Sequence, residues 1–141
     1  MLRFVCVILL AGKHQYFMEG SKGYISMATI FHIASKDKWK RSSSRGQYTE
    51  ESLKSEGFIH CSTAEQVVDT ANKHFSGKSG LVLLKIDTSD IVSVIAYEAN
   101  TDSGETYPHI FGPINHAAIK EIIELPVSSD GTFSLPSTLE V

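Results

Sequence analysis

Apolar and polar positions along residues 27–141 predict several short elements instead of one long repeat. Residues 29–34 (TIFHIA) are rich in β-branched and aromatic side chains, which is typical of a buried strand. Residues 81–86 (LVLLKI) are apolar on both faces, so we expect a central strand there. Further strands are predicted within residues 58–61, 91–98 and 117–127.

Helical signals lie mainly in the first half of this region. Ser35 is a good N-cap for a helix over residues 36–41, and Thr49 can cap a second helix that ends at residue 54. Ser62 and Glu65 have the spacing of a capping box. One apolar face of the helix that follows would carry Ala64, Val67, Val68, Ala71 and Phe75.

Two segments are predicted to form loops. Residues 42–46 are polar and serine-rich. Residues 107–114 (YPHIFGPI) hold two prolines and a glycine, which predicts a shaped loop and not a regular element. Because helices come early and strands late, we predict an α+β domain with a few short helices and a strongly bent, mostly antiparallel sheet.

We assign the domain to residues 27–141, since 42% hydrophobic and 21% charged residues suit a single core. Residues 1–26 are assigned to an N-terminal extension. Residues 4–11 are apolar but far shorter than the roughly 20 residues that span a bilayer, and no clear cleavage site follows. A secretory signal, a non-native or alternative start and a tail that docks as an extra strand are the open interpretations.

The net charge limits the classes of expected partner, and the cysteine content indicates the compartment. A net charge of -3 argues against nonspecific nucleic-acid or membrane binding, because such proteins carry an excess of Lys and Arg. The two cysteines, Cys6 and Cys61, do not make a disulfide framework, so we expect a reducing, cytoplasmic location. The sequence does not specify an oligomeric state.

Candidate chemistry rests on histidines, because no phosphate-binding glycine loop, nucleophile elbow or zinc helix motif is present. His60 ends a predicted strand just before a helix N-terminus, where backbone N–H groups favour a phosphate or carboxylate. Ser62 and Thr63 would add hydroxyl groups to that pocket. The alternative is that Ser62 only caps the helix and His60 is a core histidine.

His109 lies in the restrained segment 107–114, and its imidazole suits proton transfer near neutral pH. The alternative is a structural turn with a surface histidine. Glu98, at a strand end, is the best carboxylate candidate, and a solvated carboxylate is its alternative. We interpret His32 and His74 as mainly structural, His116 as a surface residue and Cys61 as a small buried hydrophobe.

The chain resembles a known family through residues 57–63 (GFIHCST), His74-Phe75, residues 81–87 (LVLLKID) and residues 107–114. The order of these motifs is similar to that of the family called domain of unknown function 952. The resemblance implies an ADP-ribosyltransferase-like fold, in particular that of RNA 2′-phosphotransferases.

Those transferases carry a histidine that ends the first strand and a later His-x-Ser segment, which together hold the riboses and phosphates of NAD. Phe31-His32 resembles the first of these and His60-Cys61-Ser62 the second. Two departures stand out. Only Arg41 and Arg45 are available for the several arginines that contact RNA phosphate, and the His-Tyr-Glu triad of classical transferases is not evident, although Glu98 could replace its carboxylate.

The resemblance favours an NAD- or nucleotide-processing transferase. His60 and Ser62 would bind ribose or phosphate, His109 would act in acid–base chemistry or contact substrate, and His32 would line the cleft. Thr63, Tyr107 and Gly112 complete the expected ligand-binding set. The alternatives are a noncatalytic nucleotide-binding module and a metal-dependent hydrolase that uses His60, His109 and Glu98. The transferase and the nucleotide-binding module require no metal ligand, so none is assigned for them.

Overall fold

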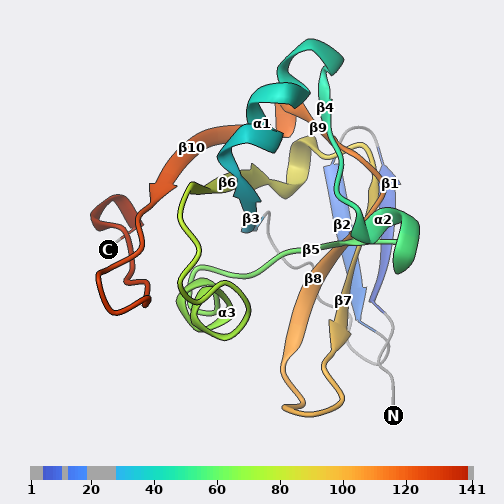
Figure 1. Ribbon diagram of the computed structural model, residues 1–141. Coiled ribbons are helices and arrows are strands. Elements are labelled where there is room, and N and C mark those ends of the chain that lie inside the picture. Colours follow the sequence, from blue (N-terminus) through green and yellow to red (C-terminus); the bar gives the residue numbers. More distant parts are fainter. Residues whose placement is uncertain (1–4, 11–12, 19–27, 140–141) are drawn as a thin grey trace.

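The computed structural model describes the backbone of residues 5–10, 13–18 and 28–139, and the side chains of residues 28–139 (Figure 1). The helices are α1 (Lys36–Ser42), α2 (Ser52–Ser55) and α3 (Val67–His74). The strands are β1 (Val5–Leu10), β2 (Lys13–Met18), β3 (Thr29–Ser35), β4 (Gln47–Tyr48), β5 (Ile59–His60), β6 (Leu81–Asp87), β7 (Val94–Ala99), β8 (Thr106–Phe111), β9 (Ile114–Asn115) and β10 (Ile119–Leu125). Short 3-10 turns are η1 (Ser43–Arg45), η2 (Thr88–Asp90), η3 (His116–Ala118) and η4 (Ser137–Leu139).

The strands form antiparallel sheets, in orders β10-β6-β3, β5-β8-β7, β4-β9 and β1-β2. The two three-stranded sheets meet where Phe31 and Ser62 exchange backbone hydrogen bonds of 2.8 Å in both directions. The predicted α+β class and the antiparallel pairing are therefore confirmed. The predicted single bent sheet is instead divided, and the β1–β2 hairpin lies beside β7 as a separate sheet (Figure 1).

The core lies on both faces of β6, as its apolar sequence predicts. Val82, Leu84 and Ile86 face a cluster that includes Ile59 and Ile110 of the second sheet. Its other face packs with α3 and the C-terminal segment, through Leu81, Leu83, Val67, Ala71 and Phe133. The predicted apolar face of α3 is thus the face that it buries. No helix in the described part of the chain is long and apolar enough to cross a membrane.

Residues 107–114 do not form a loop, and this prediction was wrong. Most of them belong to β8, the central strand of its sheet, although Pro108 lacks the N–H that a ladder needs. The Pro108 carbonyl accepts from the Cys61 N–H at 3.0 Å, at the point where the two-residue strand β5 ends. Proline is tolerated there because at most one ladder hydrogen bond is lost.

The predicted helix starts and the polar loop also need correction. Ser62 does not cap α3, because its backbone is paired with Phe31 and the helix begins only at Val67, after a turn over residues 63–66. There the Thr63 N–H donates to Gln66 Oε1 at 3.1 Å. Thr49 does not cap α2, which begins at Ser52. Residues 43–45 form the 3-10 turn η1, which ends at Gly46 with a φ of 69°.

Gly112 is required by a close approach of the chain. A Cβ atom there would lie 2.5 Å from Ser93 Oγ and 3.0 Å from Ser93 Cβ, and that hydroxyl donates to the Pro113 carbonyl at 2.6 Å. We expect Gly112→Ala to lower the free energy of unfolding by about 1–3 kcal/mol through overpacking, measured by urea denaturation. The loss should shrink in a Ser93→Gly background, and an equal loss there would contradict this explanation.

Candidate active-site groove

A groove of about 920 Å³ runs between the two three-stranded sheets and is lined by side chains of β3, α1, α3, β5, β7 and β8. Pockets for small ligands commonly have volumes of about 300–1,000 Å³, so this one has room for a nucleotide. Three of the predicted histidines line it, namely His32, His60 and His109. The fold therefore brings together segments that lie far apart in the sequence.

His109 and Glu98 form a hydrogen-bonded pair at the groove wall. Ala96 is the direct partner of His109 in the β7–β8 register, so Glu98 is its diagonal neighbour on the same face. His109 Nδ1 lies 2.7 Å from Glu98 Oε2. A carboxylate accepts, so Nδ1 carries the proton in the neutral ring. Nε2 then has a free lone pair and no hydrogen-bond partner among residues 28–139.

Burial lowers the pKa of His109 below its ordinary value of 6.5, and the neighbouring His60 lowers it further. The Glu98 carboxylate opposes this shift but does not cancel it. His109 is therefore mainly neutral at pH 7, with an unprotonated Nε2. A neutral imidazole oriented by a carboxylate is the arrangement that a general base requires.

An aromatic cluster holds the His109 ring. Phe58 stacks on it, with ring centroids 4.0 Å apart and planes inclined by 13°. His60, the register partner of His109, meets both rings at their edges, at 4.7 Å from Phe58 and 5.4 Å from His109. The half-exposed His60 Nε2 pairs with Glu56 Oε2 at 2.8 Å. His60 is thus a groove residue and not a core histidine.

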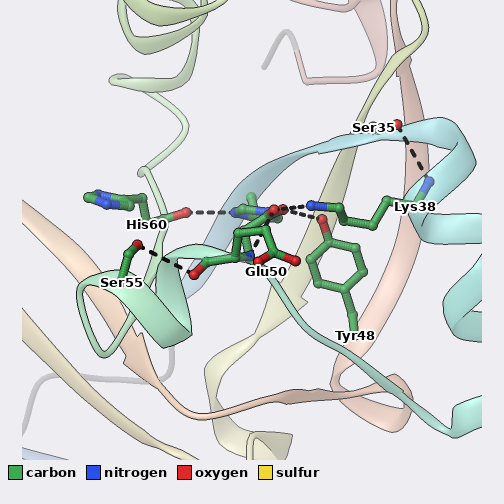
Figure 2. Close-up of polar contacts among 8 residues, drawn as sticks. Ser35, Lys38, Tyr48, Glu50, Ser55 and His60 are labelled. Atoms are coloured by element: carbon green, nitrogen blue, oxygen red, sulfur yellow. Dashed lines mark hydrogen bonds and ion pairs between the residues drawn. The ribbon is translucent and has the colours of Figure 1, made fainter.

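His32 belongs to a second, more buried network, and Figure 2 labels the residues around it, namely His60, Glu50, Tyr48 and Lys38. Its Nδ1 lies 2.7 Å from the His60 carbonyl oxygen, so Nδ1 donates, because a carbonyl only accepts. Its Nε2 lies 3.4 Å from Glu50 Oε2, and it donates to that carboxylate in the imidazolium form of the ring. Both ring nitrogens are therefore directed at protein partners, although the ring also borders the groove.

Glu50 is the hub of this network. The Tyr48 hydroxyl donates to its Oε2 at 2.6 Å, and the Lys38 ammonium donates to its Oε1. Burial alone would raise the pKa of Glu50, but hydrogen bonds from His32, Lys38 and Tyr48 outweigh it and lower that pKa well below its ordinary value. Glu50 was not among the predicted site residues, since an isolated glutamate after a polar loop carries no sequence signal.

The remaining predicted ligand-binding residues do not form the pocket that the sequence predicts. Ser62 is buried, and its hydroxyl donates to Thr70 Oγ1 at 3.2 Å. Tyr107 lines the groove and donates to Glu105 Oε2 at 3.1 Å. Thr63 and Gly112 lie outside the lining. The Ser62 and Thr63 N–H groups are already bonded within the chain, so neither is available for the anion expected at the start of α3.

Two further residues complete the comparison with the sequence. His116 is not a surface residue as predicted. It is half-buried, with its ring 4.9 Å from that of Trp39 and Nε2 3.1 Å from Ser42 Oγ. Cys61 is a small buried hydrophobe, and burial raises the pKa of its thiol. Within the described residues, no three His, Cys, Asp or Glu side chains are placed to share a metal ion, so the geometry does not favour the hydrolase alternative.

Comparison with known proteins places the chain in a family. The family model described as "Protein of unknown function (DUF952)" matches residues 33–122. The chain belongs to the DUF952 family. The matched segment includes His60, Glu98 and His109, and His32 immediately precedes it. The groove is thus built almost wholly from the segment that defines DUF952 in this chain.

Solved structures of one protein are similar to this DUF952 chain. The crystal structure of protein CC0527 from Caulobacter crescentus is 29% identical, with a TM-score of 0.71 over 79% of this chain and 98% of that one. The solution NMR structure of CC0527 is 27% identical, with a TM-score of 0.59 over 74% and 90%. No curated protein matches the chain.

Proposed function

We propose that this chain is a nucleotide-processing transferase that takes NAD as its donor, with His109 as the general base. The observation that supports this is the free Nε2 of a neutral His109, oriented by Glu98, on a groove wide enough for a nucleotide. The likeness of Phe31-His32 and His60-Cys61-Ser62 to the NAD-binding segments of RNA 2′-phosphotransferases supports the choice of donor. The choice of donor thus comes from family resemblance, whereas the role of His109 comes from the geometry of the site.

The proposed reaction transfers ADP-ribose from NAD to an acceptor hydroxyl, or to water when no other acceptor is supplied. The bond between ribose C1′ and the nicotinamide nitrogen breaks, and its electron pair leaves with nicotinamide. The acceptor oxygen forms the new bond to C1′, and its proton passes to His109 Nε2. Glu98 stabilises the imidazolium that results, because it already accepts the Nδ1 proton.

The direct test is incubation of the full chain with NAD, with chromatography of released nicotinamide and calorimetric titration with NAD and ADP-ribose. Saturable binding of NAD, together with release of nicotinamide at a rate that rises with NAD concentration and then saturates, supports the transferase. Binding of both ligands without release would instead identify the noncatalytic nucleotide-binding module. Absence of binding to either ligand would reject both functions.

A further inference from the structure

The two walls of the groove differ in charge. The lining residues of β5, β7, β8 and the β7–β8 turn include Glu98 and Glu105 but no lysine or arginine. The opposite wall, formed by α3 and the residues that follow it, contributes Lys73, His74 and Lys78 together with one carboxylate, Asp69. Two lysines against one carboxylate leave this wall with a positive balance, so it suits the negatively charged end of a ligand.

The ammonium charges of the α3 wall are not neutralised by carboxylates of the described residues. Neither Lys73 nor Lys78 has an ion pair with any residue between 28 and 139. In the same range, four other lysines are paired with carboxylates, namely Lys36, Lys38, Lys85 and Lys120. Lys78 Nζ lies 5.4 Å from the centre of the Phe75 ring, which keeps this ammonium at the groove.

A hydroxyl group accompanies these cations. Thr70 lines the groove one helical turn before Lys73, so the two side chains lie on the same face of α3. Thr70 Oγ1 accepts from the buried Ser62 hydroxyl, which leaves its own proton to donate into the groove. A cation in the last turn of a helix also complements the helix dipole, but this does not account for Lys78, which follows the helix.

We infer that the α3 end of the groove, formed by Thr70, Lys73 and Lys78, binds phosphate groups of the ligand. A dinucleotide bound there would place its diphosphate against α3 and direct a ribose toward His109 on the opposite wall. The identity of the ligand rests on the proposed function, whereas phosphate binding at this end does not.

The test is calorimetric titration of the full chain with inorganic pyrophosphate and with ADP-ribose. We expect saturable binding of both ligands, weakened by about tenfold or more in Lys73→Glu/Lys78→Glu, since charge-assisted hydrogen bonds are lost. The matched control is Lys40→Glu/Lys54→Glu, which makes the same charge change at two exposed lysines that lie outside the groove and have no ion pair within the described residues. Its affinities should stay within about twofold of the wild type.

Lys73→Gln/Lys78→Gln provides a second pair of substitutions with a milder charge change, and circular dichroism confirms folding of each variant. Equal weakening by the groove and control variants, or no weakening by either, would overturn the inference. ADP-ribose binding without pyrophosphate binding would also overturn it, while leaving the proposed function in place. Pyrophosphate binding that depends on Lys73 and Lys78 without nicotinamide release would support the phosphate site and reject the transferase.

Discussion

Replacing His109 with glutamine is expected to lower the rate of nicotinamide release by about 10²–10⁴-fold, the usual contribution of a general base. Glutamine can still donate an amide hydrogen to Glu98, so the wall of the groove should keep its shape. It has no group that can take a proton from the acceptor hydroxyl. The affinity for ADP-ribose, measured by calorimetry, should therefore change much less than the rate.

The pH dependence gives an independent check. The pKa of His109 is lowered from 6.5, so the free base predominates at pH 7 and is lost only as the pH falls through a midpoint below 6.5. The rate should rise with pH through that midpoint and then remain level. His60→Gln removes a neighbour that lowers the pKa and should move the midpoint upward, whereas Glu98→Gln should move it downward.

The matched control is His116→Gln, since that imidazole packs against Trp39 and lies outside the groove. It should leave the rate within about twofold of the wild type, because it touches no reacting group. NMR titration of the His109 ring would measure the midpoint directly, even in the absence of turnover. A variant His109→Gln that keeps most of the wild-type rate would remove this residue from the mechanism.

Much of the fold could be predicted because it follows from local patterns. The two-faced apolar strand β6, the N-cap Ser35 and the apolar face of α3 are all properties of a few neighbouring residues. Residues 107–114 differ from the prediction for a physical reason. Two prolines and a glycine predict a loop, yet the missing donor of Pro108 coincides with the end of β5, which only the tertiary pairing reveals.

In the candidate site, too, some residues could be predicted from local motifs and others could not. His60 and His109 could be singled out because each lies in a motif with unusual residues, whereas their register pairing, with rings 5.4 Å apart, is a property of the folded chain. Glu50 carries no such signal, because its importance comes from donors on three separate elements. Lys38 of α1, Tyr48 of β4 and His32 of β3 converge on it only in the folded chain.

Glu50→Gln is expected to lower the free energy of unfolding by about 2–4 kcal/mol, because it removes the charged acceptor shared by three partly buried donors. The amide has one acceptor oxygen where the carboxylate has two, so at least one of the donors from Lys38 and Tyr48 would face an N–H group. Urea denaturation at pH 7 would measure the loss. Glu51→Gln is the matched control, since Glu51 is adjacent and exposed and its side chain makes no hydrogen bond among the described residues.

The pH dependence of this loss identifies its origin. The folded-state pKa of Glu50 lies below its ordinary value of 4.5, so the unfolded chain binds the proton first as the solution is acidified. The stabilisation by Glu50 is therefore fully present above pH 4.5 and is lost as the pH falls through the lower folded-state pKa. The difference between wild type and Glu50→Gln should shrink accordingly below that pH. A difference that stayed constant under acid conditions, or one no larger than for Glu51→Gln, would show that the carboxylate charge does not hold His32, Lys38 and Tyr48 together.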